Sequence, residues 1–170
     1  MKICIVSDSH DRAEPLRQAA AAALAAGAAA LVHCGDLIGA HTLAGVLALS
    51  LPVHLVHGNN VGDVFALNRL VARSKGLLHY HGGEADLHLG GRRLFVIHHP
   101  HLARGMAATG DYALVCCGHS HEAGVAEQPN IQGTSTWLVN PGTVAGIGAP
   151  PTWILADLDL MRFEVRALAA

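Results

Sequence analysis

The sequence predicts an α/β fold in which two mixed β-sheets pack face to face with helices on the outside. In the first part of the chain, short apolar runs alternate with helical segments three times, which is typical of a parallel sheet built from βαβ units. In the second part, short strand-like runs follow one another with glycine-rich turns between them, which indicates a second sheet.

The first part begins with a buried strand, the apolar run Ile3-Cys4-Ile5-Val6, which ends abruptly in polar residues. A helix is expected at 14–26, because Pro15 is tolerated in a first helical turn and Gly27 can close the last turn. Further strands are expected at 28–33 and 53–57, and further helices at 42–49 and 64–73.

The second part is expected to consist mostly of strands, separated at first by Gly82-Gly83 and Gly90-Gly91. The expected strands are 77–80, 85–89, 94–97, 113–117, 122–127, 136–139, 153–157 and 162–167, and a short helix is expected at 102–108. The chain shows no internal repeat and no linker, so we expect one domain over residues 1–170.

The composition favours a globular protein in which any metal ion is catalytic. A chain of 170 residues buries roughly 70% of its unfolded surface, so it can fold without a metal. None of the four cysteines forms a CxxC pair, so we expect buried small side chains in a reducing compartment and no structural zinc site. The net charge is −2 and the eleven Lys and Arg are scattered, which disfavours binding to duplex nucleic acid.

The sequence also disfavours export and membrane insertion. Only four apolar residues follow Met1-Lys2 before the first polar cluster, too few for a signal peptide. The apolar run at 19–32 is too short and too rich in alanine to span a membrane. We therefore expect a cytoplasmic protein without a membrane partner.

Polar side chains follow the apolar runs at the points where the predicted strands end, and ligands of α/β sheets gather at these carboxyl ends. The side chains are Asp8, His10, Asp36, Asn59, His98, His119 and His121. Residues two apart share one face of a strand end, so Asp8 with His10, and His119 with His121, form pairs of donors. A pair of divalent ions needs a bridging carboxylate, with imidazole nitrogens and further oxygens in the remaining positions. The set therefore predicts a dinuclear metal centre.

The ordered motifs resemble those of the calcineurin-like metallophosphoesterases. The motifs are Asp8-Ser9-His10, Gly35-Asp36-Leu37-Ile38, Gly58-Asn59-Asn60, His98, Gly118-His119-Ser120-His121 and Asn140-Pro141-Gly142-Thr143. The spacing of His98-His99-Pro100-His101, Gly110-Asp111-Tyr112 and the later histidine pair is similar to that of the compact bacterial and archaeal phosphodiesterases. The resemblance covers residues 1–157 and implies a four-layer α/β/β/α sandwich.

The resemblance also implies an assignment of the metal ligands. Asp8, His10, Asp36 and His121 would bind the first ion, Asp36 would bridge, and Asn59, His98 and His119 would complete the second site. A hydroxide shared by two ions would attack phosphorus in line with the leaving oxygen, so the expected activity is that of a phosphodiesterase or phosphatase. Mixed nitrogen and oxygen donors suit Mn²⁺, which we expect first, and also Ni, Co, Fe or Zn.

The sequence departs from the family pattern at the general acid. Many members have His directly after the motif Asn, but here Asn60 stands there, and an amide cannot act as an acid at neutral pH. Compact members often carry an Asp close after that Asn, whereas here Asp63 comes four residues after Asn59. We therefore expect activated or diester substrates, with His99 (or His101) as the candidate acid. Asn60 and Arg12 are candidate substrate-binding residues.

The sequence is compatible with two classes of function. The first is a hydrolase of a small phosphoester, with a homodimer as the default assembly. The second is a catalytically weak, metal-binding scaffold for protein interactions. The retromer subunit that resembles these enzymes serves as such a scaffold. The complete ligand set favours the enzyme, and no HxHxDH block of the metallo-β-lactamase type is present.

For the remaining histidines, the position in the chain is the basis of the prediction. We expect His33 and His57 to pack beneath the metal centre, because each directly precedes a motif. Surface or edge-strand positions are expected for the histidines whose partner the sequence does not indicate, namely His41, His54, His79, His81 and His88.

Overall fold

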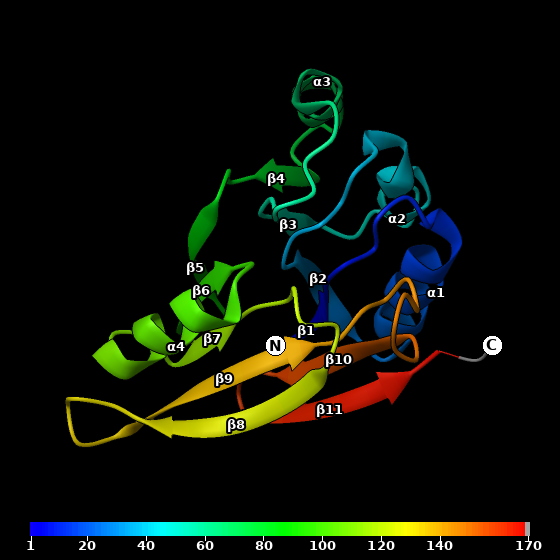
Figure 1. The fold of residues 1–170 in the computed structure, drawn as a ribbon. Helices are drawn as coiled ribbons and strands as arrows, with labels where there is room; N and C mark the ends of the chain where they lie inside the picture. Colours follow the sequence, from blue (N-terminus) through cyan, green and yellow to red (C-terminus); the bar gives the residue numbers. More distant parts are fainter. Residues whose placement is uncertain (169–170) are drawn as a thin grey trace.

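The first sheet contains the alternating strands predicted at the start of the chain. The computed structural model describes residues 1–168, and the ribbon in Figure 1 shows two sheets lying one on the other. The first has the order β11-β10-β1-β2-β3-β4. Its parallel strands are β1 (Lys2–Val6), β2 (Ala28–His33), β3 (Val53–Leu55) and β4 (Leu78–Tyr80). The antiparallel strands β10 (Thr152–Asp157) and β11 (Arg162–Ala167) extend it beside β1.

The second sheet contains the strands of the later part of the chain, in the order β5-β6-β7-β9-β8. Its central strands β6 (Arg92–Ile97), β7 (Leu114–Cys116) and β9 (Ser135–Pro141) are parallel. The antiparallel strands β5 (Glu84–Leu89) and β8 (Ala123–Pro129) form its two edges. Both sheets are therefore mixed, as predicted.

Helices cover the outer face of each sheet (Figure 1). The helical elements are α1 (Ala13–Ala25), the 3₁₀ turn η1 (Ala40–Leu43), α2 (Ala44–Leu47), α3 (Val64–Arg73) and α4 (Pro100–Thr109). Alternate residues of β1 show the layering: Cys4 and Val6 pack with α1, whereas Ile3 and Ile5 face the second sheet. A separate apolar cluster joins α4 to the far face of the second sheet. The structure confirms the four-layer α/β/β/α sandwich.

The predicted boundaries differ from the structure at two places that matter for the site. The helix expected at 42–49 is a 3₁₀ turn followed by one short α-helical turn. The strand expected at 53–57 ends at Leu55, because the N–H of His57 leaves the sheet and donates to Gly82 O at 2.8 Å. The chain is thereby free to turn toward Asn59. In the described part of the chain, no helix has the length and hydrophobicity needed to cross a membrane.

Candidate metal centre

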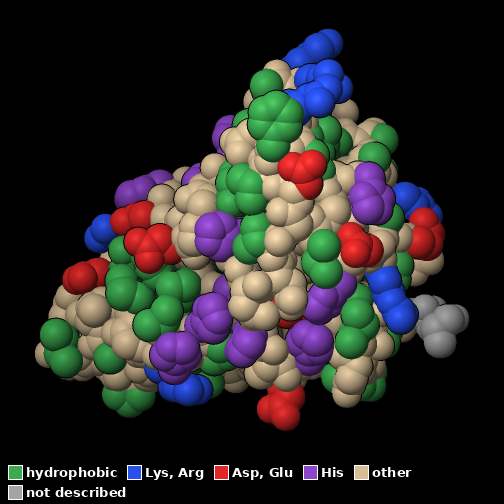
Figure 2. Space-filling view, turned by 45° about the horizontal axis from the view of Figure 1, so that its top comes forward, with side chains coloured by type: hydrophobic (Ala, Val, Ile, Leu, Met, Phe, Trp, Pro, Cys, Tyr) green, Lys and Arg blue, Asp and Glu red, His purple; other side chains and the backbone are tan. Residues whose placement is uncertain are grey.

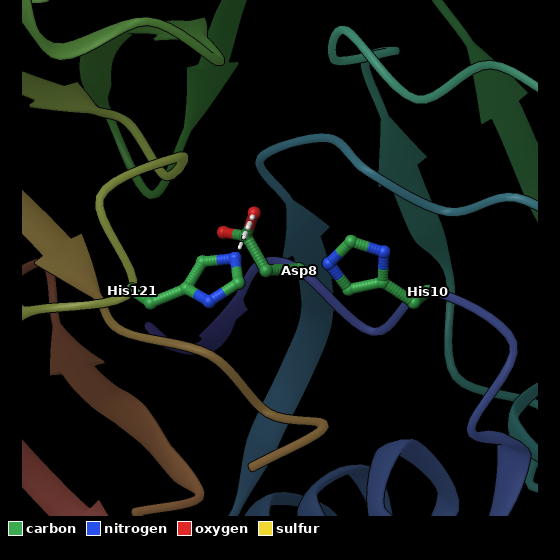
Figure 3. Close-up of side chains that lie close together, drawn as sticks. All are labelled: Asp8, His10 and His121. Atoms are coloured by element: carbon green, nitrogen blue, oxygen red, sulfur yellow. Dashed lines mark ion pairs between the residues drawn. The ribbon is translucent and has the colours of Figure 1, made fainter. Parts of the chain in front are cut away.

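The predicted ligands come together on loops at the carboxyl ends of the strands. Asp8 and His10 follow β1, Asp36 follows β2, Asn59 follows β3, His98 follows β6, and His119 and His121 follow β7. Within residues 1–168, two groups have ligand atoms all within 4.8 Å of one another: Asp8, His10 and His121, and Asp8, Asp36 and His98. Asp8 belongs to both, and Figure 3 shows it between the two imidazoles of the first group.

The other two predicted ligands lie beside the second group. Asn59 Oδ1 is 3.1 Å from Nε2 of His98, and the ring of His119 is 5.1 Å from the ring of His98, centroid to centroid. The space-filling view in Figure 2 shows several histidines gathered on this face of the molecule. The structure thus brings together all seven residues that the motifs indicated.

Two buried polar atoms of the centre have no hydrogen-bond partner among the described residues, namely Asp8 Oδ1 and His10 Nε2. Nε2 of His121 lies 3.2 Å from Asp8 Oδ1 without forming a hydrogen bond to it. An unsatisfied buried polar atom costs about 1–3 kcal/mol, so native proteins avoid such atoms unless a further group binds them. A carboxylate oxygen and an imidazole nitrogen are both donors to divalent ions. The side chains present therefore fit a metal ion.

In His98 and His121, a hydrogen bond at Nδ1 fixes the direction in which Nε2 points. Nδ1 of His98 lies 2.8 Å from Cys34 O, and Nδ1 of His121 lies 2.7 Å from Ile147 O. A carbonyl oxygen only accepts, so each Nδ1 carries a proton, and in the neutral form of each ring Nε2 is the nitrogen with the lone pair. In both rings Nε2 faces the carboxylates, at 3.3 Å from Asp36 Oδ1 in His98 and 3.2 Å from Asp8 Oδ1 in His121. This is the arrangement by which proteins orient metal-binding imidazoles.

The backbone at the centre is strained. Five of the predicted ligands have positive φ angles: Asp8 (54°), His10 (47°), Asp36 (56°), His119 (70°) and His121 (60°). Such angles are uncommon in residues other than glycine, and they cluster at sites where surrounding contacts enforce them. The loops therefore hold their ligands in place at some cost in conformational energy.

The glycines of two motifs leave room for ligands on neighbouring loops. A methyl group at Gly58 would overlap Asp36 Oδ1. At Gly118 it would overlap Ser7 Oγ and lie 2.8 Å from Asp8 Oδ2. Only glycine allows these backbones to approach the carboxylates so closely. The glycine before each ligand is thus part of the packing of the centre.

His33 has a more specific role than the expected packing beneath the site. It is fully buried, its Nε2 lies 2.9 Å from Ser9 Oγ, and its Nδ1 accepts the N–H of Gly35 at 3.2 Å. Burial, reinforced by His98, lowers the pKa of His33 from 6.5 to about 3. The neutral ring therefore ties the loop of Asp8 and His10 to the loop of Asp36. Its position before a motif indicated the neighbourhood, but not these two bonds.

Asn140 and Thr143 support the centre in a way that the sequence did not reveal. Asn140 Nδ2 donates to Gly118 O at 2.8 Å and to Ser120 Oγ at 3.0 Å. Thr143 Oγ1 donates to Asp8 O at 3.1 Å. The motif that follows β9 therefore holds the β7 and β1 loops. The signal was present as a match to the family pattern, without an assigned role.

Asn60 contacts Asp36 through two donors. Its backbone N–H donates to Oδ1 at 2.8 Å, and its Nδ2 donates to Oδ2 at 2.6 Å. Burial favours the neutral form of Asp36, but these two hydrogen bonds, with His98 and His10 nearby, outweigh it and lower the pKa of Asp36. Asp36 is therefore ionised at neutral pH and ready to bind a cation.

The candidate acid and substrate-binding groups lie around the rim. The ring of His99 is 4.9 Å from that of His119 and 5.7 Å from that of His101, and burial with the neighbouring His98 and His119 lowers the pKa of His99. Arg12 is exposed and donates to Ala145 O at 3.3 Å. Asp63 caps α3, with Oδ1 accepting from the backbone of that helix at 2.9 Å.

Comparison with known proteins identifies the family and the fold. The model of the calcineurin-like phosphoesterase superfamily domain matches residues 1–161. Comparison with curated protein sequences gives no match. An archaeal phosphodiesterase structure is similar, with a TM-score of 0.87 and 23% identity over 99% of this chain and 100% of that one.

Two further solved structures share the fold at lower similarity. Yfce, a phosphoesterase from E. coli, has a TM-score of 0.64 and 20% identity over 99% of this chain and 100% of that one. Vps29 from Entamoeba histolytica, in complex with Zn²⁺, has a TM-score of 0.65 and 14% identity over 99% of this chain and 97% of that one.

Proposed function

The chain belongs to the calcineurin-like phosphoesterase superfamily, and from that premise we propose that it is a metal-dependent phosphodiesterase with two divalent ions. The observation that supports this most strongly is the pair of unsatisfied buried atoms, Asp8 Oδ1 and His10 Nε2, in the middle of a full set of ligands. A similar archaeal structure is described as a phosphodiesterase, and Yfce as a phosphoesterase.

We assign the ligands as the motifs suggest, with Asp36 shared by the two ions, while in the structure Asp8 is the carboxylate common to both ligand groups. Asp8, His10, Asp36 and His121 hold the first ion, and Asp36, Asn59, His98 and His119 hold the second. Each carboxylate oxygen of Asp36 has two lone pairs, so it can accept from Asn60 and still bind a cation. When bound, the ions supply a nucleophile at neutral pH and neutralise charge on the phosphoryl oxygens. Mn²⁺ is the expected ion, with Ni, Co, Fe and Zn compatible with the same donors.

A diester with a good leaving group is the substrate class that this site favours. Position 60 holds an amide, and both donors of Asn60 are directed at Asp36. The carboxylate of Asp63 is engaged in capping α3. Neither group is placed to protonate a poor leaving group, so substrates whose leaving oxygen departs as an anion react best. His99, beside His98 and His119, is the remaining candidate acid.

The test uses chelator-stripped protein and bis-p-nitrophenyl phosphate, with and without Mn²⁺. We expect hydrolysis only with metal, and its loss in Asp36→Asn. His88→Gln is the matched control, because it removes an exposed imidazole on β5, away from the centre. Hydrolysis by metal-free wild type at the same rate, or by Asp36→Asn with Mn²⁺, would refute the proposal.

The same assay addresses the scaffold alternative, which the shared fold of the Vps29 structures leaves open. A scaffold would bind metal and yet hydrolyse neither diesters nor monoesters. Metal binding can be followed by calorimetry independently of turnover. His99→Gln then distinguishes an acid from a positioning group: loss of rate only on poor leaving groups supports proton donation by His99.

A further inference from the structure

Three histidines outside the metal centre lie together at the edge of the first sheet. His54 is on β3, and its register partner on β4 is His79. His81 follows two residues later and projects from the same face. The ring of His54 lies 4.9 Å from that of His79 and 5.3 Å from that of His81, centroid to centroid. The expected edge-strand position is found for His79 on β4, and the structure adds the partners that the sequence did not indicate. We call these three side chains the edge histidine cluster.

Two ring nitrogens of the cluster already have the spacing of metal ligands. Nδ1 of His54 lies 3.1 Å from Nε2 of His81. Two nitrogens on a tetrahedral ion, each about 2.0–2.1 Å from it, are roughly 3.3 Å apart. In a neutral imidazole the proton can sit on either nitrogen. The ring nitrogen that faces the neighbouring histidine can therefore carry the lone pair and bind a metal ion. In the structure the nitrogens of His79 lie outside the 4.8 Å spacing found at the metal centre, so rotation about the side-chain bonds of exposed His79 is needed to bring in a third donor.

Two rings of the cluster, those of His54 and His81, are in the state that metal binding requires. Burial, with His81 and His79, lowers the pKa of half-buried His54 to about 4. Burial, with His79, also lowers the pKa of His81. Both rings are neutral at pH 7, so an ion does not have to displace protons from charged imidazoles.

We propose that His54, His79 and His81 bind one transition-metal ion, Zn²⁺ or Cu²⁺, between β3 and β4. All three donors are imidazoles, which suit Zn and Cu better than the hard ions Mg²⁺ and Ca²⁺. An ion held there joins an edge strand to the strand that leads to the Asn59 loop. The site shares no residue with the metal centre and does not depend on the proposed activity.

The test compares Zn²⁺ stoichiometry by equilibrium dialysis in the full chain. The variant is His79→Gln/His81→Gln, which changes two exposed side chains and keeps the half-buried His54. We expect it to bind one Zn²⁺ per chain fewer than wild type. The control His41→Gln/His88→Gln removes two exposed imidazoles elsewhere and keeps the wild-type stoichiometry.

Equal stoichiometry in wild type and in the cluster variant would overturn the proposal, as would an equal loss in the control. Far-UV circular dichroism shows whether the variant is folded. If it is not, the single variant His79→Gln takes its place, and we expect it to weaken the additional Zn²⁺ site at least about tenfold. Unchanged affinity in that variant would exclude His79 as a ligand.

Discussion

Replacement of His33 by leucine should destabilise the protein, because the imidazole makes two buried hydrogen bonds between loops. In His33→Leu, Ser9 Oγ and the N–H of Gly35 lose the partners that they have in the structure. His33 and Ser9 are both fully buried, so water does not readily replace the ring. Leucine fills most of the same volume, so the loss of polar contacts dominates the change.

The magnitude follows from two unsatisfied buried groups at about 1–3 kcal/mol each, which is about 2–6 kcal/mol in total. Two milder variants divide this loss. His33→Asn can accept from Gly35 through its amide oxygen, and His33→Gln can reach Ser9. Each should cost about half as much as leucine, because each retains one of the two hydrogen bonds.

The pH dependence provides an independent check. The pKa of His33 is about 3 in the folded protein and 6.5 when unfolded, so the unfolded state takes up a proton first as the pH falls. Stability from this group is present above pH 6.5 and is lost progressively at lower pH, on the order of 2 kcal/mol between pH 7 and pH 5. Leucine has no such loss, so the difference between wild type and His33→Leu should shrink at pH 5.

Urea denaturation of chelator-treated protein at the two pH values measures both effects, since bound metal would add stability of its own. A free energy of unfolding for His33→Leu within about 0.5 kcal/mol of wild type at pH 7 would refute the reasoning. A difference between the two proteins that does not change with pH would show that His33 is not held neutral by burial.

Three further substitutions test the centre and its surroundings. Asp8→Asn removes the carboxylate common to both ligand groups, so calorimetry should show Mn²⁺ affinity falling more than the 10–100-fold typical of outer-shell changes. An unchanged affinity would count against the site. Gly118→Ala forces a methyl group onto Ser7 Oγ and should lower the free energy of unfolding, measured with urea, by about 1–3 kcal/mol. Gly124→Ala, with open space around the new methyl group, should be nearly neutral. Equal effects of the two substitutions would contradict this packing argument. Asp63→Ala removes the cap of α3 and should cost about 1 kcal/mol without slowing diester hydrolysis, and a large loss of rate at unchanged stability would show that Asp63 acts in the reaction.

Much of the fold and all seven candidate ligands could be predicted from local patterns. Buried strands are apolar on both faces, as in β1, and the polar residues that follow them stand out against that background. The prediction of a single helix at 42–49 was wrong. Residues 40–43 form a 3₁₀ turn, which the apolar pattern alone cannot distinguish from an α-helix.

The residues that support the ligands were hidden, because their partners are far away in the chain. Thr143 bonds to the carbonyl of Asp8 from 135 positions later, and Asn140 bonds to the carbonyl of Gly118 from 22 positions later. A buried threonine and an ordinary polar turn residue have the same local signature. The role of such a supporting residue depends on its hydrogen-bond partner in the fold and not on its residue type.

The sequence by itself determined which donors are present and the order in which they follow the strands, because apolar runs and polar ends are local properties of the chain. Only the tertiary structure decided that β10 and β11 join the first sheet beside β1, and that His33 bridges two loops. It also decided that His54 meets His79 and His81, because the pairing of β3 with β4 is made across a helix. Contacts of this kind depend on which strands become neighbours, and that is settled by the packing of the whole core.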